Sequence, residues 1–417
     1  MALSLRSSRT AVAPASELAP VTSLVQNRRV AQALAVLDQL GSWTTEQQIL
    51  LTEIPAPTFQ EAARAEAVRK FFVAAGLRTR TDSAGNVIGE RPGSSRKDVV
   101  LISAHLDTVF PAGTRIKVQR DGRRISAPGI SDNGAGLAAV VCLARAVHEA
   151  KLRTQCSLLF AANPGEEGEG NLRGMRKLVE TLRGRLRAVI AVDGACTDHI
   201  TTMALASRRL EVSLTGPGGH SWADFGMPNP VHALSRGIGK FLATRVPDSP
   251  RTTFNVGVIQ AGTSVNTIGG LALAKVDMRS ESETELDRLE AGLRKAMEAG
   301  IADEMAAAAA AGHASDSRIE VAFRSLGDRP GGELPANAPL LEAVRQADRY
   351  LSNQSRLERS STDANIPLSL GIPAISVGGG GRSGGAHSPG EWYDPTGREL
   401  GVKRILLTAL AVAGIES

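Results

Sequence analysis

The amino-acid sequence predicts an α/β fold, in which a mainly parallel, twisted sheet with flanking helices carries an inserted ferredoxin-like α+β domain. Short, continuously apolar runs are typical of strands buried on both faces of a parallel sheet. Four such runs occur, at residues 99–102, 156–162, 188–192 and 374–377. A helical pattern over residues 134–150 separates the first two runs, and this alternation indicates right-handed crossovers. Between residues 210 and 323 the order becomes β-α-β-β-α-β, the ferredoxin-like signature.

Local patterns predict the other elements outside the insertion. Apolar residues at helical spacing indicate helices over residues 30–40 and 60–75, and Gly76 ends the second of them. After the insertion, the α/β pattern resumes with a helix over residues 340–351. We found no internal repeat.

Inside the insertion, alternating apolar and polar residues predict half-exposed strands. They are residues 210–214, 253–259, 271–278 and 319–323. Helical spacing predicts a helix over residues 231–243 and a longer one that begins after Ser282 and ends near Gly312. Ser282 and Glu285 form a capping-box pattern at its start. We therefore expect residues 1–206 and 326–417 to form one domain in two parts, with residues 207–325 as the inserted domain.

Composition excludes several classes of protein. The chain has 417 residues, a net charge of +5 and 3% aromatic residues. Its basic residues are scattered and lack interleaved aromatics, so we expect no nucleic-acid partner. It has no apolar stretch of about 18 residues, so we expect no membrane span. The first ~20 residues lack the apolar core of a signal peptide and indicate a disordered leader. Three cysteines without paired spacing argue against a disulfide framework and favour a cytoplasmic location.

Five potential metal ligands stand near the ends of predicted strands or the start of a helix, where α/β sheets place their chemistry. They are His105, Asp132, Glu167, Asp193 and His387. His105 and Asp107 are two residues apart, so on a strand they point to one face and suit a ligand and its hydrogen-bonding partner. Each has an ordinary alternative. His105 and Asp107 can pair by chance, Asp132 can cap a helix, and Glu167 can be a solvated acid. Asp193 can form a turn, and His387 can be a plain loop histidine.

The conjunction of all five favours a site for two divalent cations. Zinc binds imidazole and carboxylate ligands, and the same set of ligands would also accept cobalt or manganese. Two cations ~3.5–4 Å apart can activate water for hydrolysis. Glu166, next to Glu167, is then the candidate general base that takes a proton from that water. The glycine-rich run over residues 378–385 does not match the Walker phosphate-binding pattern.

The order His-x-Asp, Asp, Glu-Glu, Asp and a late His resembles the co-catalytic zinc exopeptidases. That family includes tripeptide aminopeptidase (peptidase T), glutamate carboxypeptidases, aminoacylase and acetylornithine and succinyl-diaminopimelate deacylases. The resemblance extends from about Thr45 to the C-terminus, and residues 361–365 and 222–224 look closest to the peptidase T-like branch. One departure is Asn133, because several peptidase members carry an acid there. The glycine-rich approach to His387 is also longer than in many members.

The resemblance implies a role for each candidate in the metal centre. His105 and Asp193 would hold one zinc ion, and Glu167 and His387 the other. Asp132 would bridge the two ions, and its peptide link to Asn133 would be cis. Asp107 would orient His105, and Glu166 would be the general base.

The resemblance also assigns the inserted domain as a lid through which the chain forms a homodimer. His220, in Gly-Pro-Gly-Gly-His-Ser, would reach the substrate oxyanion, often across the dimer. Asn266 and Arg279 would contact the substrate carboxylate, and the planar guanidinium of Arg279 suits bidentate binding. The ordinary alternatives are a turn histidine, a hairpin-loop asparagine and a surface arginine.

These observations favour a metal-dependent aminopeptidase or related exopeptidase that hydrolyses amide bonds of small peptides with water activated by two zinc ions. An N-acyl or N-carbamoyl amino acid amidohydrolase would use the same metal site, so this alternative stays open. A metal-dependent binding protein without catalysis is a third possibility. The presence of every ligand together with Glu166 and Asp107 argues against it.

Overall fold

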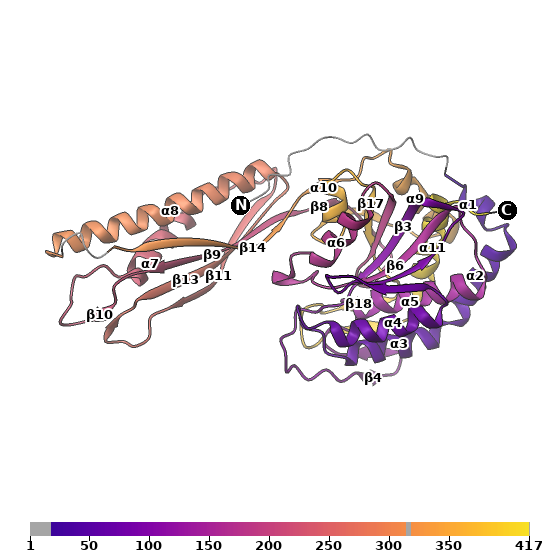
Figure 1. Cartoon of the computed structure of the whole chain (residues 1–417), viewed down its shortest axis with the longest axis horizontal. Helices are drawn as coiled ribbons and strands as arrows, with labels where there is room; N and C mark the ends of the chain where they lie inside the picture. Colours follow the sequence, from indigo (N-terminus) through magenta and orange to yellow (C-terminus); the bar gives the residue numbers. More distant parts are fainter. Residues whose placement is uncertain (1–17, 314–317, 417) are drawn as a thin grey trace. The chain divides into compact units, whose positions relative to one another are not determined.

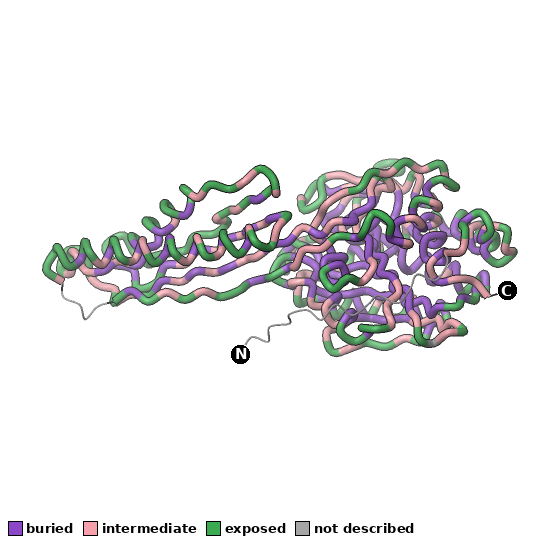
Figure 2. The backbone as a smooth tube through the Cα atoms, turned by 90° about the horizontal axis from the view of Figure 1, so that it is seen from above, coloured by how far each residue is buried: buried purple, intermediate pink, exposed green. Residues whose placement is uncertain are grey.

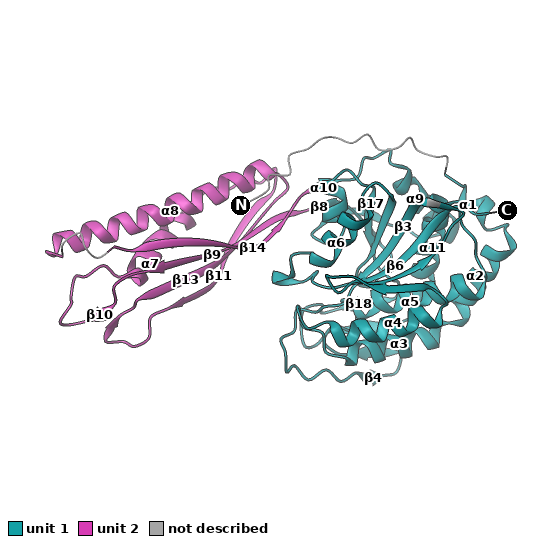
Figure 3. Ribbon diagram, viewed as in Figure 1, with its two compact units in different colours: residues 1–204, 332–417 teal, residues 205–331 magenta. Residues whose placement is uncertain are grey.

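The computed structural model describes residues 18–313 and 318–416 of the chain. Within it the chain forms two compact units (Figure 3). Unit 1 comprises Met1–Ala204 and Gly332–Ser417, and unit 2 comprises Leu205–Gly331. The expected N-terminal leader falls mostly outside the described residues.

Unit 1 is built on a sheet that has nine strands within the described ranges, in the order β1-β2-β6-β3-β7-β17-β8-β15, with β16 beside β8. The strands are β1 (Arg78–Thr81), β2 (Val87–Arg91), β3 (Ser95–His105), β6 (Cys156–Asn163), β7 (Leu186–Val192), β8 (His199–Ala204), β15 (Gly332–Glu333), β16 (Arg356–Ser360) and β17 (Ala374–Val377). The central strands β6, β3, β7 and β17 run parallel to one another. All residues of β6 and β17 are buried, as strands covered on both faces must be. The predicted mainly parallel sheet is therefore confirmed.

Helices cover this sheet (Figure 1). They are α1 (Val21–Leu24), α2 (Arg28–Gln39), α3 (Gly41–Glu53), α4 (Ala62–Ala74), α5 (Gly134–Glu149), α6 (Arg173–Leu182), α9 (Pro339–Leu351), α10 (Asn365–Ser369) and α11 (Arg398–Ala413). Both α5 and α11 pack on β3, β6 and β7, and most of their residues are buried. In Figure 2 the buried residues of unit 1 are concentrated in its interior. No helix in the described part of the chain is long and apolar enough to cross a membrane.

Two smaller features of unit 1 lie near the strand ends. A one-turn 3-10 helix, η1 (Gly168–Gly170), follows the loop after β6. An antiparallel sheet, in the order β18-β19-β5-β4, joins segments far apart in the chain. Its strands are β4 (Gln119–Asp121), β5 (Arg124–Ser126), β18 (Arg382–Gly384) and β19 (Trp392–Asp394). This small sheet brings the segment before Asp132 next to the segment around His387.

Unit 2 has the predicted order β-α-β-β-α-β. Its elements are β9 (Ala206–Thr215), α7 (Pro230–Leu242), β11 (Thr252–Ala261), β13 (Leu271–Ser280), α8 (Glu283–Ala310) and β14 (Glu320–Arg329). The strands form an antiparallel sheet in the order β11-β13-β9-β14, and α7 and α8 pack together on β9 and β13. Ser282 caps α8 by accepting a hydrogen bond from the Glu285 amide. The ferredoxin-like α+β insertion is thus confirmed as a fold.

Candidate metal centre and active site

The five predicted metal ligands all lie in unit 1, near strand ends. His105 is the last residue of β3, Asp193 directly follows β7, and Glu167 lies in the loop after β6. Asp132 precedes the N-cap of α5, and His387 lies between β18 and β19. Carboxyl ends of parallel strands meet at one edge of a sheet, and this edge is where α/β proteins bind ligands.

Asp132 stands between the two histidines. Its Oδ1 lies 3.1 Å from His105 Nε2, and its Oδ2 lies 3.0 Å from His387 Nε2. His105 Nε2 also lies 3.6 Å from Asp193 Oδ1. His387 Nε2 lies 3.2 Å from Glu167 Oε1. The two oxygens of one carboxylate therefore face two different sets of ligands.

The side chains present fit a pair of divalent cations. Within residues 18–313 and 318–416, three groups of donor atoms lie close enough together to hold a metal, and each includes Asp132 or His105. They are His105, Asp132 and Asp193; Asp132, Glu167 and His387; and His105, Glu166 and Glu167. Imidazole and carboxylate together are a zinc-type donor set. The buried Oδ1 of Asp132 lies near His105, yet no described residue is its hydrogen-bond partner. A metal ion would complete the coordination of that oxygen.

The electrostatics of the two histidines also call for positive charge at this place. The carboxylates of Asp132 and Glu167 raise the pKa of His387 to about 10. Burial lowers the pKa of His105, but the nearby carboxylates of Asp107, Asp132 and Asp193 outweigh burial and raise it well above its ordinary value. The surrounding carboxylates therefore favour the charged form of each imidazole. Divalent cations would supply the same positive charge.

Asp107 organises the loop that carries Glu166 and Glu167. Its fully buried carboxylate accepts hydrogen bonds from the Glu166 amide (2.9 Å), the Glu167 amide (2.9 Å) and Thr58 Oγ1 (2.9 Å). Burial raises the pKa of Asp107, but His105 and the two amides hold it below its ordinary value. His105 Nδ1 lies 3.1 Å from the main-chain oxygen of Asp107 and 3.7 Å from its carboxylate. The main chain at Asp107 therefore contributes to the orientation of His105.

Glu391 supports Asp132 and was not found by sequence reasoning. It is fully buried, and its carboxylate accepts hydrogen bonds from the amides of Gly129, Ser131 and Asp132 and from the Ser131 hydroxyl, at 2.7–2.8 Å. Burial raises its pKa. A single glutamate about 260 residues away along the chain leaves no pattern that could have predicted this role.

Asn133 connects Asp132 to the end of β7. The Asp132–Asn133 peptide bond is cis. Asn133 Nδ2 donates to the main-chain oxygen of Val192 (2.8 Å), and its Oδ1 accepts from the amides of Gly194 and Gly136 (3.1 Å each). The same side chain thus holds both neighbours of Asp193 and caps α5.

Asn163 and Asp363 form a buried, hydrogen-bonded pair next to His105, the last residue of β3. Asn163, the last residue of β6, is the cross-strand partner of His105, and its Nδ2 donates to Asp363 Oδ2 (2.7 Å). Burial raises the pKa of Asp363 to about 6. The sequence pattern around residues 361–365 contributed to the resemblance, but no pattern predicted that Asp363 would lie near the candidate metal ligands.

The three predicted substrate contacts lie in unit 2 and fall into two groups. The short strands β10 (Gly219–His220) and β12 (Thr267–Ile268) pair, and the Ser221 amide donates to the main-chain oxygen of Asn266 (3.1 Å). His220 and Asn266 are therefore close together, and both are exposed. Arg279 lies towards the other end of β13, roughly 25 Å of strand beyond Leu271. There its Nε pairs with Asp277 Oδ2 (2.8 Å).

Solved structures with similar folds include two peptidases and an amidase, according to their names. Aminopeptidase PepT from Bacillus cereus ATCC 10987 has a TM-score of 0.68 and 20% identity over 89% of this chain and 99% of its own. The Bacillus subtilis YXEP protein, a dinuclear metal-binding peptidase of the M20 family, has a TM-score of 0.64 and 18% identity, over 91% of this chain and 100% of its own. An amidase of the hydantoinase/carbamoylase family from Burkholderia vietnamiensis has a TM-score of 0.68 and 17% identity, over 89% and 97%.

Identities this low establish the shared fold alone. The family itself is shown by the sequence, because the model of peptidase family M20/M25/M40 matches residues 101–411. That stretch spans most of the chain and contains all five candidate ligands. The match confirms the resemblance drawn from the motifs, and the chain belongs to peptidase family M20/M25/M40, a family of metal-dependent hydrolases.

Proposed function

We propose that this hydrolase is an exopeptidase of the aminopeptidase type that acts on small peptides. The observation that carries the proposal is the position of Asp132, which faces a histidine and a second carboxylate on each side. A buried glutamate, Glu166, lies in the same cluster. The likeness of fold to aminopeptidase PepT supports the same class of reaction.

We assign the metal ligands as two overlapping sets. His105 and Asp193 would hold one ion, Glu167 and His387 the other, and Asp132 both. Divalent ions bound there, which we take to be zinc, supply the Lewis acidity that polarises a scissile carbonyl and lowers the pKa of water. The His and carboxylate donors would also accept cobalt or manganese.

Glu166 is the proposed general base. Its main chain is held by the hydrogen bond to Asp107, and its carboxylate approaches those of the ligands without being one of them in this assignment. A carboxylate in this position accepts a proton from the attacking water and returns it to the leaving amine. Asp107 acts through its neighbours, because it positions the Glu166–Glu167 loop and His105.

Unit 2 is the proposed source of the substrate contacts and of a homodimer interface. His220 would contact the oxyanion, and Asn266 and Arg279 the substrate carboxylate. The separation of Arg279 from the other two within unit 2 is compatible with contacts drawn from two copies of the chain. The edge strand β11 is mostly exposed and carries an exposed Ile259, so its outer edge, on the side away from β13, would be available to pair with a second copy. Size measurement by light scattering would test the dimer.

The test of the proposed activity is a panel of substrates offered to metal-loaded enzyme, with a chelator-treated control. The panel contains di- and tripeptides, blocked peptides, N-acetyl amino acids and N-carbamoyl amino acids. We expect chelator-sensitive release of the N-terminal residue from free peptides. Release of the C-terminal residue from blocked peptides would reassign the enzyme as a carboxypeptidase, and no turnover with several metals would contradict the proposal.

An N-acyl or N-carbamoyl amino acid amidohydrolase is the second candidate. Its support is the likeness of fold to the Burkholderia vietnamiensis amidase, which covers 89% of this chain. The same ligands and Glu166 would serve this reaction, because both reactions cleave an amide bond. Turnover confined to the acyl or carbamoyl members of the panel would establish it in place of the peptidase.

A further inference from the structure

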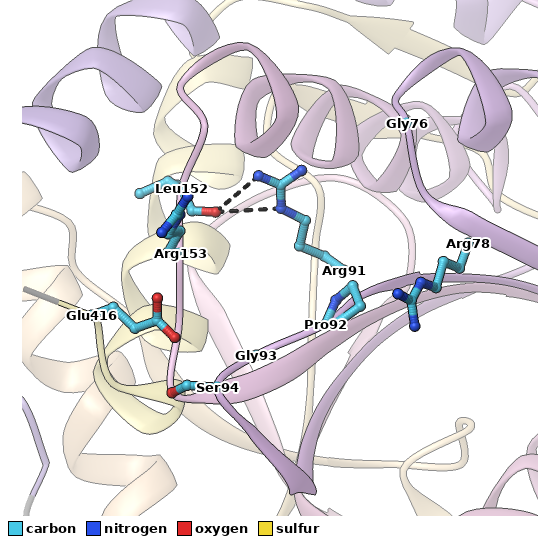
Figure 4. A pocket seen from close by; sticks show the side chains of 9 residues that line it. All are labelled: Gly76, Arg78, Arg91, Pro92, Gly93, Ser94, Leu152, Arg153 and Glu416. Atoms are coloured by element: carbon cyan, nitrogen blue, oxygen red, sulfur yellow. Dashed lines mark hydrogen bonds between the residues drawn. The ribbon is translucent and has the colours of Figure 1, made fainter.

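Unit 1 has a pocket at the amino ends of β3 and β6, at the opposite ends of these strands from the candidate metal ligands. This pocket of about 340 Å³ opens beside the residues that precede β3 and β6 (Figure 4). Its lining is Gly76, Arg78, Arg91, Pro92, Gly93, Ser94, Leu152, Arg153 and Glu416. The candidate metal ligands lie at the other ends of these strands, roughly 30 Å of β3 away. Nothing in the proposed hydrolysis uses this pocket.

Three guanidinium groups and one carboxylate make up its charge. Arg78 comes from β1, Arg91 from the end of β2, and Arg153 from the loop between α5 and β6. Arg91 donates from Nε and Nη2 to the main-chain oxygen of Leu152, at 3.3 and 3.2 Å, as the dashed lines in Figure 4 show. These bonds hold Arg91 beside the residue that precedes Arg153. Glu416 is held beside Arg153, because its main-chain amide donates to the main-chain oxygen of Arg153.

None of the three arginines has a carboxylate partner among the described residues. Some exposed arginines elsewhere, such as Arg120 and Arg356, do pair with carboxylates. Glu90, which lies opposite Arg78 in the β1–β2 register, is 3.9 Å from Arg80 instead. Burial and the positive charge of Arg153 together lower the pKa of Arg91. Three positive charges against the single carboxylate of Glu416 leave an excess of like charge that costs free energy, and a bound anion would offset that cost.

We propose that this pocket binds a phosphate dianion, either inorganic phosphate or the phosphate group of a small ester. Two positive charges remain after Glu416 is counted, which matches the charge of phosphate near neutral pH. Guanidinium groups bind tetrahedral oxyanions through paired N–H donors. The lining is mainly polar, and the volume exceeds that of phosphate alone, so an ester substituent has room.

Bound phosphate would tie together segments that are distant in the sequence. They are β1, the turn from β2 to β3, the loop before β6 and the C-terminal segment after α11. A ligand that binds the folded state alone raises its stability by mass action. We therefore expect phosphate to raise the melting temperature of the full chain more than chloride does at the same ionic strength.

The decisive experiment is calorimetric titration of the metal-loaded, full-length protein with inorganic phosphate and, in a second arm, glycerol 3-phosphate. Arg153→Gln removes an exposed pocket arginine, and Arg91→Gln removes the half-buried one. Arg28→Gln is the matched control, because Arg28 is an exposed arginine at the start of α2 that has no carboxylate partner in the described part of the chain. We expect Arg153→Gln and Arg91→Gln each to weaken binding by about tenfold or more, and Arg28→Gln to leave it unchanged.

Glu416→Gln provides a test in the opposite direction. It removes the carboxylate that opposes the anion, so phosphate should bind more tightly than to the unsubstituted protein. Tighter binding of glycerol 3-phosphate than of phosphate would identify an ester as the ligand, and the reverse would identify free phosphate. The proposal is overturned if phosphate does not bind, if Arg153→Gln binds it like the parent, or if chelation of the metal abolishes all binding.

Discussion

The two ends of the central strands in unit 1 carry charges of opposite sign that are held in different ways. At the carboxyl ends, Asp107 and Glu391 are fully buried and each accepts several hydrogen bonds. At the amino ends, Arg78 and Arg153 are exposed and have no carboxylate partner in the described structure. Buried hydrogen bonds position a site before its ligand arrives, as catalysis requires. Among the described residues, no buried carboxylate positions Arg78 or Arg153 in this way.

The largest expected effect is at the carboxyl end, in Glu166→Gln. The amide cannot accept the proton of the attacking water, so kcat should fall by about 10²–10⁴. Metal content, measured by elemental analysis, should be unchanged, because Glu166 is not an assigned ligand. Glu169→Gln, at an exposed glutamate in η1, is the control. Full activity of Glu166→Gln would show that another group is the base.

The second prediction tests whether the buried hydrogen bonds of Glu391 stabilise the segment that carries Asp132. Glu391→Ala leaves four donors around Asp132 without an acceptor in a buried place. The free energy of unfolding in urea should fall by on the order of 3 kcal/mol. Glu399→Ala, at an exposed position of α11, should change it by less than about 0.5 kcal/mol. Equal losses in the two variants would mean that Glu391 contributes no more than a surface residue.

Asp363, near the same ends of the strands, gives a prediction about how the stability of the protein depends on pH. Its raised pKa means that the folded state favours the protonated form, so its contribution to stability is full below the unfolded pKa of about 3.9 and is lost as pH rises through about 6. Asp363→Asn mimics the protonated form. In metal-free protein the variant should become more stable than the parent above that pH, by on the order of 1–3 kcal/mol. Urea unfolding across pH would reveal a constant difference if the interpretation is wrong.

The smallest effect is expected at the amino end. Arg91→Gln loses two hydrogen bonds to Leu152 but also removes repulsion from Arg153. In phosphate-free buffer the free energy of unfolding should change by less than about 1 kcal/mol. A loss as large as that of Glu391→Ala would mean that both ends of the strands are built in the same way.

Sequence patterns predicted the elements in which burial is either continuous or regularly spaced along the chain. The runs that became β6 and β17 are buried throughout, so their apolar character was continuous. Helix α11 was missed because its buried positions include charged residues. Arg404 is fully buried against Asp348, and Arg398 hydrogen-bonds the Tyr393 hydroxyl, so polarity did not mark the exposed face.

The candidate site was predictable only where its residues form short motifs. His105 and Asp107, or Glu166 and Glu167, stand near strand ends that the apolar runs already marked. Glu391 and Asp363 serve through contacts that cross about 200 residues or more of chain, and such contacts leave no local pattern. The assigned roles of His220, Asn266 and Arg279 stay predictions, as do those of the metal ligands and the general base.

The side chain of Asn133 limits how this site could change in evolution. It donates to Val192 and accepts from Gly194 and Gly136, so it needs both a donor and an acceptor. Aspartate has nearly the same shape, yet an ionised carboxylate would face the Val192 oxygen without a proton to share. It would also add a negative charge beside Asp132. Asparagine and aspartate are therefore not interchangeable at this position, and a lineage that exchanges them must also change the partners around the end of β7.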